Sequence, residues 1–328
     1  MKLFSKIIFY VFTNLLIFLL AACTPKIDLD HRIGFGLAEK ADANYWATEL
    51  EAQWYFDWGL KESRYSSDLE YWQTIRVNEN GFTPSQDKIE FILKTFPGYT
   101  WIIGNEPDNQ YQDNTSPEKY AEIYHELYYL IKKNDKTAKV AIAGVSQPTP
   151  SRIAYLEEVL DTYQTRYGET LPVDWWNIHA YVLREEINSW GAGLPVGIDS
   201  TEGNLYEIDA HGDIEIFKEN LISFRRWLKE NGYQNTPLVI TEYGILLPEE
   251  FGFDQEFISN YLLEVNDWML HYSNPEIGYP KDEYRLVQKF AWFSLSDPNY
   301  PNSNLANLET NTLTKIGIAF ATLSANNK

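Results

Sequence analysis

Residues 101–107 read Trp-Ile-Ile-Gly-Asn-Glu-Pro, and residues 237–244 read Pro-Leu-Val-Ile-Thr-Glu-Tyr-Gly. Each stretch is a short apolar run, long enough for a buried strand, that stops at a glutamate followed by Pro or by Tyr-Gly. The pattern places Glu106 and Glu242 where a strand becomes a loop, and such edges carry the chemistry of barrel enzymes. Both are candidate catalytic residues; the alternative is that each is only a polar strand end.

Strand-like and helix-like runs alternate over the rest of the chain. Eight strands are predicted, at residues 32–37, 52–58, 72–77, 100–105, 139–143, 174–180, 238–241 and 286–293. Helical patterns separate most of them, which favours parallel pairing through βα crossovers. The predicted fold class is therefore α/β, a (β/α)₈ TIM barrel without a second domain.

The boundaries of several helices are visible in the sequence. One is expected to begin after Ser116 with Pro117 at its first position, and another to end at Gly168. Two connections, 182–212 and 294–312, are much longer than usual. They follow the sixth and eighth predicted strands, so we expect them to form walls of a cleft, unless they are surface excursions.

The N-terminus predicts export. Lys2 and Lys6 precede an apolar stretch that ends in Ala-Ala before Cys23. This arrangement resembles a bacterial lipobox, which implies that residues 1–22 are a signal peptide, that Cys23 is lipidated, and that residues 23–31 form a tether. The rest, 32–328, would be the barrel domain, held on the outside of a bacterial cell membrane. An uncleaved anchor helix is the alternative.

Charge and composition restrict the possible partners. The formal net charge is −20, and it becomes −22 without residues 1–22, which carry two lysines and no acid. So acidic a surface disfavours nucleic acids and anionic polysaccharides. Aromatic residues make up 16% of the chain, and flat rings with polar edges are what sugar faces stack on. We expect a neutral oligo- or polysaccharide as substrate and a monomeric protein.

Two carboxylates across a barrel mouth suffice to cleave a glycosidic bond. Asn105-Glu106-Pro107 closing a fourth strand, with Glu242 closing a seventh, resembles the clan A glycoside hydrolases, which are retaining (β/α)₈ barrels. The resemblance implies that Glu106 is the general acid/base and Glu242 the nucleophile. It also implies that Asn105 bonds the substrate 2-hydroxyl and the nucleophile.

The same resemblance suggests further substrate-binding residues. His179 and Tyr181 lie two apart on the sixth strand and so point to one side, His179 to orient the acid/base or substrate and Tyr181 to bond the nucleophile. Trp292, at the end of the eighth strand, corresponds to the clan's sugar-stacking floor. For His179 and Trp292, packing in the core is the alternative.

Residues 54–59 read Trp-Tyr-Phe-Asp-Trp-Gly and resemble the Trp-Tyr-Asn-Trp-Gly run of family 128 glycoside hydrolases, the fungal-type and bacterial β-1,3-glucanases. Asp57 stands where that pattern has Asn. The likeness makes Asp57 and Trp58 candidate substrate-binding residues and indicates a β-1,3-glucan as a possible substrate.

To act as an acid, Glu106 is expected to have a raised pKa, while hydrogen bonds keep Glu242 ionised. The five histidines show no metal-binding spacing, and Gly34-x-Gly36 lacks the rest of a dinucleotide fingerprint, so no metal and no cofactor are expected. Two other functions stay open: a cell-surface glycan-binding lipoprotein without turnover, and a transglycosylase that uses the same residues.

Overall fold

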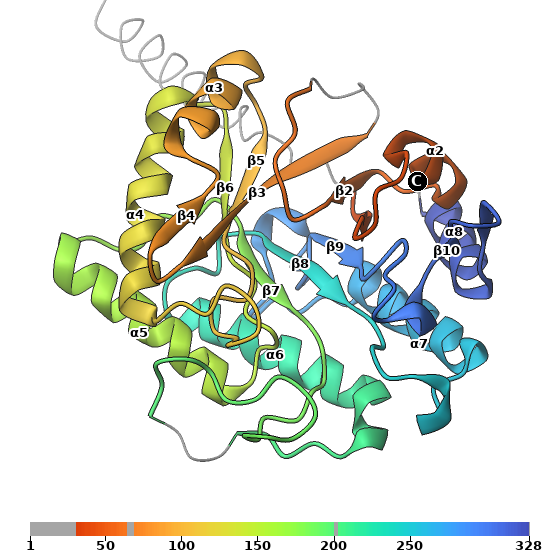
Figure 1. Cartoon of the computed structure of the whole chain (residues 1–328). Coiled ribbons are helices and arrows are strands. Elements are labelled where there is room, and N and C mark those ends of the chain that lie inside the picture. Colours follow the sequence, from red (N-terminus) through yellow and green to blue (C-terminus); the bar gives the residue numbers. More distant parts are fainter. Residues whose placement is uncertain (1–30, 64–68, 200–202, 328) are drawn as a thin grey trace, which may run out of the picture.

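The computed structural model describes residues 31–63, 69–199 and 203–327. Eight parallel strands form a barrel with helices around it (Figure 1). The strands are β1 (Ile33–Gly36), β2 (Trp54–Phe56), β3 (Glu70–Asn78), β5 (Thr100–Ile103), β6 (Lys139–Ile142), β7 (Trp176–His179), β8 (Leu238–Tyr243) and β9 (Lys289–Trp292). The predicted TIM barrel is confirmed, and each of the eight predicted strands overlaps one of these.

The strands follow one another around the barrel in the order β6-β5-β3-β2-β1-β9-β8-β7. Every neighbouring pair in this order is parallel. A parallel bridge between Ala141 and Trp175 joins β6 to the start of β7 and nearly closes the cylinder. Because all eight strands run the same way, their carboxyl ends meet at one rim.

The helices largely follow the sequence signals. They are α2 (Ala43–Leu50), α3 (Gln86–Thr95), α4 (Pro117–Asn134), α5 (Pro150–Tyr167), α6 (Ile214–Glu230), α7 (Gln255–His271) and α8 (Lys315–Asn326). Ser116 is the N-cap residue of α4 and Pro117 its first residue, as predicted. Gly168 ends α5 with a φ of 72°, in the left-handed region that glycine adopts at low cost.

Smaller elements decorate the barrel. A short strand, β4 (Gly81–Thr83), pairs antiparallel with the end of β3, and β10 (Ala306–Asn307) pairs with β11 (Thr312–Leu313) in the long connection after β9. The alternating pattern did not indicate these hairpins, because strands of two or three residues are too short to show a period.

Large side chains fill the barrel interior. This inner cluster consists of Trp54, Phe56, Trp72, Ile102, Ala141, Trp175, Val239 and Ala291, with Trp58 packed against it. Alternate residues of the same strands point outward into a second, larger core beneath the helices. The barrel is therefore a packed cylinder, and only its rim is available for binding.

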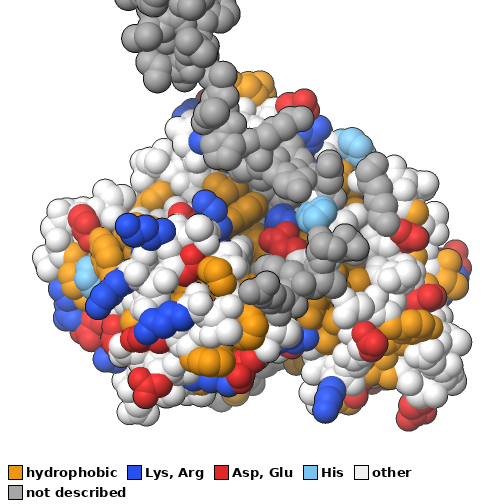
Figure 2. Space-filling view, turned by 90° about the horizontal axis from the view of Figure 1, so that it is seen from above, with side chains coloured by type: hydrophobic (Ala, Val, Ile, Leu, Met, Phe, Trp, Pro, Cys, Tyr) orange, Lys and Arg blue, Asp and Glu red, His pale blue; other side chains and the backbone are white. Residues whose placement is uncertain are grey.

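Charges are unevenly placed on this acidic protein. The last turns of α3 and α4 carry Lys94, Lys132 and Lys133, where positive charge complements the helix dipole. Figure 2 shows Lys and Arg side chains mostly on the side of the molecule that bears α3 to α5, with hydrophobic side chains scattered between charged ones. Among the described residues, no helix is long and apolar enough to span a membrane. Residues 1–30, with the predicted signal peptide and Cys23, lie outside the described part.

The packed interior explains why β1 has a glycine at position 34. A Cβ there would lie 2.5 Å from ring atoms of Trp54, whose side chain is fully buried and whose indole N–H donates to the carbonyl of Arg32. We expect Gly34→Ala to lower the free energy of unfolding by about 1–3 kcal/mol through overpacking, measured by urea denaturation. Gly59→Ala is the control, because its Cβ would meet nothing closer than 3.6 Å. Equal stability of the two variants would contradict this account.

Candidate active site

A cavity of about 550 Å³ opens at the rim where the strands end. Loops after β1, β2, β5, β7, β8 and β9 form its walls, together with the end of β3. The residues that line it are Ala38, Trp58, Arg76, Asn105, Glu106, Asn109, Tyr111, Gln112, Tyr181, Leu183, Trp190, Gly191, Ala192, Glu242, Leu246, Leu247, Phe293, Asp297, Asn299 and Tyr300. Both predicted catalytic glutamates are among them, and both long connections contribute walls, as predicted.

Glu106 enters the cavity from the turn that follows β5. Its φ of 45° lies in the left-handed region, which is costly for a residue with a Cβ. Its backbone N–H donates to the carbonyl of Gly144 at 3.0 Å. The amide of Asn109 donates to its carboxylate at 2.8 Å. The turn therefore fixes both the backbone and the direction of this carboxylate.

Glu242 lies on β8 where the register with β7 shifts, so that His179 pairs with Glu242. Irregularities of this kind re-aim side chains next to functional sites. The indole N–H of Trp58 donates to one carboxylate oxygen at 2.8 Å, and the hydroxyl of Tyr181 donates to the other at 3.1 Å. Both oxygens of Glu242 are thus held, and the predicted bond from Tyr181 is present.

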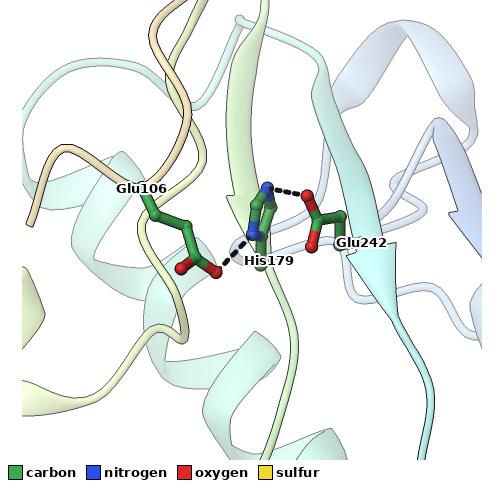
Figure 3. A group of neighbouring side chains, drawn as sticks. All are labelled: Glu106, His179 and Glu242. Atoms are coloured by element: carbon green, nitrogen blue, oxygen red, sulfur yellow. Dashed lines mark hydrogen bonds and ion pairs between the residues drawn. The ribbon is translucent and has the colours of Figure 1, made fainter. Parts of the chain in front are cut away.

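His179 stands between the two glutamates (Figure 3). Its Nδ1 lies 2.8 Å from an oxygen of Glu106, and its Nε2 lies 3.4 Å from an oxygen of Glu242. One oxygen of each carboxylate and one ring nitrogen lie within 4.8 Å of one another, a spacing that would also suit metal ligands. Here each ring nitrogen already faces a carboxylate, so the imidazole takes the bridging place that a cation would need.

The three groups shift one another's protonation. Burial disfavours a charged imidazole, but Glu242 and Glu106 outweigh it and raise the pKa of His179. Burial also disfavours an ionised Glu106, yet the hydrogen bond and charge of His179, with the charge of Arg152, lower its pKa. Burial raises the pKa of Glu242, and the more distant His179 offsets this only in part.

The pKa of Glu106 is lowered and that of Glu242 is raised. The sequence-based expectation was the reverse, because it gave Glu106 the raised pKa. The reason is the position of His179, which lies closer to Glu106 than to Glu242. These two shifts favour a proton on the imidazole of His179 over one on Glu106. The 2.8 Å hydrogen bond between His179 Nδ1 and Glu106 offers a direct path for a proton to move between the two groups.

A buried ion cluster braces the turn after Glu106. The guanidinium of Arg152, from α5, is fully buried between Asp108 and Glu185. It also donates to the carbonyls of Ala192 and Gly193 at 3.2 and 2.9 Å. One cation thus joins the acidic turn after β5 to the long wall between β7 and α6. Sequence reasoning did not find it, because Arg152 lies far from its partners in the chain.

Three predicted substrate-binding residues do not line the cavity: the buried His179 described above, Trp292 and Asp57. Trp292 is fully buried beneath the helices, packs on Tyr243 and donates to the carbonyl of Ser303. Asp57 bonds the hydroxyl of Tyr71 and lies 3.3 Å from the ammonium of Lys61. The reason is the period of a strand: Trp54, Phe56 and Trp58 point to the barrel axis, so Asp57 points outward. The predictions for Trp292 and Asp57 are wrong in this respect, whereas Trp58 does line the cavity.

Asn105 lines the cavity, but its expected bond to Glu242 is not seen. Among the described residues, Glu242 receives its hydrogen bonds from Trp58 and Tyr181 and faces His179. The amide of Asn105 is 3.5 Å from the side-chain oxygen of Gln112. Its contact with a substrate hydroxyl stays a prediction.

Several cavity residues were missed. Phe293, the residue after Trp292, lines the cavity at the place where Trp292 was expected. Its ring lies 5.7 Å from that of Trp58 and 6.4 Å from that of Tyr181. Tyr300 packs on Phe293 from the loop after β9. Trp190, from the connection between β7 and α6, also lines the cavity. The strand was predicted to run to residue 293, whereas β9 ends at Trp292, whose side chain lies in the outer core, so that Phe293 reaches the cavity. Nothing in the sequence distinguished Trp190 or Tyr300 from other loop aromatics.

Residues 34–233 match the family model described as glycosyl hydrolase catalytic core. No curated protein matches the sequence significantly.

Solved structures share the fold. A family 128 (subgroup II) endo-β-1,3-glucanase from Pseudomonas viridiflava has 15% identity and a TM-score of 0.60, covering 89% of this chain and 97% of that one. A subgroup I endo-β-1,3-glucanase from Amycolatopsis mediterranei, in complex with laminarihexaose, has 14% identity and a TM-score of 0.58, with coverages of 89% and 99%. A subgroup III curdlan-specific exo-β-1,3-glucanase from Blastomyces gilchristii, in complex with glucose, has 19% identity and a TM-score of 0.58, with coverages of 91% and 100%.

The shared proton can be tested directly. In Glu106→Gln, His179 loses a hydrogen-bonded anion, so we expect the pKa of His179 to fall. The measurement is a titration of the imidazole nitrogen shifts by NMR. His211 is the internal control: it is buried away from charge, which lowers its pKa to about 4, and that value should not move. An unchanged pKa of His179 would mean that Glu106 does not stabilise the protonated imidazole.

Proposed function

Because the chain belongs to the glycosyl hydrolase catalytic core family, we propose that Glu106 and Glu242 cleave a neutral β-linked glycan, a β-1,3-glucan, with retention of anomeric configuration. Membership in this family makes the protein a glycoside hydrolase. The alternative of a glycan-binding protein without turnover is therefore not adopted. Substrate, mechanism and residue roles are the proposal.

The observation that carries the mechanism is the short distance between the glutamates. One carboxylate oxygen of Glu106 and one of Glu242 lie within 4.8 Å of each other. Retaining glycosidases keep their carboxyl groups about 5–5.5 Å apart, whereas inverting enzymes need about 6.5–9.5 Å to admit a water. A separation this short is closer to that of retaining enzymes and supports double displacement.

The roles follow from the hydrogen bonds. Glu242 is held by Trp58 and Tyr181 with its oxygens in the cavity, which suits attack on the anomeric carbon. Glu106 receives the proton of His179 and passes it to the departing glycosidic oxygen. In the second step Glu106, now ionised, takes a proton from the water that attacks the glycosyl-enzyme ester, and Glu242 leaves as a free carboxylate.

The cavity walls support a neutral substrate. Glu106, Glu242 and Asp297 all line it, and the one lining cation among the described residues, Arg76, is paired with Asp113. An anionic glycan would meet net negative charge, because His179 offsets only part of the charge of these carboxylates. Phe293 and Trp58 form the aromatic floor next to Glu242 and suit stacking of a sugar face. The fold is that of β-1,3-glucanases, which favours this linkage.

The roles of the two glutamates can be separated by rescue with azide. We expect Glu106→Ala and Glu242→Ala to lose about 10³-fold or more of their activity on laminarin. On an aryl β-laminaribioside, whose leaving group needs little protonation, azide should restore turnover in both. Glu106→Ala should yield the β-glycosyl azide, because azide attacks the glycosyl-enzyme. Glu242→Ala should yield the α-azide, because azide replaces the nucleophile. NMR of the product distinguishes the two anomers.

Glu169→Ala is the matched control, because this exposed carboxylate contacts Tyr129 and Tyr163 away from the cavity. It should keep wild-type activity. If wild-type protein inverts the anomeric configuration, or if Glu242→Ala remains active without azide, the assignment is wrong. Oligosaccharides longer than the substrate among the wild-type products would indicate the transglycosylase alternative.

We also propose that the protein is exported and anchored by a lipid on Cys23, on the strength of the Ala-Ala-Cys sequence after an apolar stretch. In a bacterial host, wild-type protein should partition into the detergent phase of a Triton X-114 extract and incorporate labelled palmitate. Cys23→Ser should do neither, since it lacks the sulfur that carries the diacylglycerol. Labelling of Cys23→Ser equal to wild type would disprove the anchor.

A further inference from the structure

Tyr111 is an aromatic side chain that the chemistry above leaves unused. It lines the rim of the cavity on the β5–α4 connection, and 73% of it is exposed. It is the most exposed of the large hydrophobic residues in the described part of the chain. Its ring is therefore available for stacking.

The turn that carries Tyr111 is held firmly. The side chain of Asn109 joins it to the catalytic carboxylate: the amide N–H donates to Glu106 at 2.8 Å, and the amide oxygen accepts from the backbone N–H of Tyr111 at 3.0 Å. One carboxylate oxygen of Asp113 accepts from the backbone N–H groups of Val77 and Asn105 at 3.0 and 2.7 Å. Tyr111 thus stands at a fixed place relative to Glu106, so little ordering is needed for binding.

Its place relative to the two carboxylates decides which sugar it can meet. The ring of the attacked sugar lies beside the nucleophile, where Trp58, Tyr181 and Phe293 surround Glu242. Glu106 must face the glycosidic oxygen, on the side of the departing sugar. The turn that follows Glu106, and Tyr111 with it, therefore lies on the leaving-group side.

Polar groups accompany the ring there. Gln112 and Arg76 line the same part of the cavity, and the guanidinium of Arg76 lies 3.4 Å from the side-chain oxygen of Gln112. Arg76 is also fixed by Asp113. An exposed ring flanked by fixed donors suits a sugar, which presents an apolar face and hydroxyl edges.

We propose that Tyr111 forms a leaving-group subsite, in which the tyrosine ring stacks on a glucosyl unit beyond the scissile bond. Gln112 and Arg76 form hydrogen bonds with the hydroxyls of that glucosyl unit. The inference rests on the proposed function and extends it. The enzyme would gain rate from the part of the substrate that departs, so it would prefer chains that extend past the cleaved bond.

Two substrates separate this role from a structural one. Laminarihexaose fills both sides of the scissile bond, whereas β-laminaribiosyl fluoride places only fluoride on the leaving-group side. We expect Tyr111→Ala to lower kcat/KM for laminarihexaose about tenfold, equivalent to about 1.4 kcal/mol, and to leave kcat/KM for the fluoride within about twofold of wild type. Tyr111→Phe, which keeps the ring, should match wild type on both substrates.

Equal losses on the two substrates would overturn the subsite, because they would show that Tyr111 only supports the position of Glu106. So would unchanged turnover of laminarihexaose by Tyr111→Ala. The proposed function fails separately, if wild-type protein cleaves neither substrate. Since Tyr111 is mostly exposed, Tyr111→Ala should unfold at the same temperature as wild type, which confirms that any loss of activity is local.

Discussion

Two buried carboxylates within 4.8 Å of each other are the constraint around which the rim of this barrel is organised. Each would be costly alone in a site of low polarity, and together they repel. Three sets of contacts offset this cost. His179 lies between the two carboxylates, Trp58 and Tyr181 donate hydrogen bonds to Glu242, and the amide of Asn109 donates one to Glu106. The contacts that offset the cost of burying these two carboxylates also fix their orientation.

The imidazole of His179, which contacts both glutamates, makes their pKa values differ. Two carboxylates can be made different by their own surroundings, one apolar and one polar. Here the difference comes from a third group, because His179 is closer to one glutamate than to the other. The raised pKa of His179 and the lowered pKa of Glu106 favour a proton on the imidazole next to Glu106, so the charges of the two glutamates do not by themselves identify an acid and a nucleophile.

Much of the fold, and the position of the two glutamates at the rim, could be predicted because they depend on local pattern. Strand 101–103 followed by Asn-Glu-Pro, and strand 238–241 followed by a glutamate, were enough to place Glu106 and Glu242 at one rim. Side-chain direction at strand ends was predicted less well: Trp292 lies in the outer core, and Phe293 reaches the cavity. Arg152 could not be found at all, since its partners come together only in the folded barrel.

The buried ion cluster around Arg152 determines which changes in the neighbouring loops the barrel can accept. The wall between β7 and α6 is fastened to the barrel by Glu185, which accepts from Thr149, Ser151 and the backbone of Asn204 as well as from Arg152. Segments beyond these fastened points can change length or composition without disturbing Glu106. A loop transplanted from a related barrel would fail unless it brought an acid at this position, because the buried Nε–H of Arg152 would lose its carboxylate acceptor.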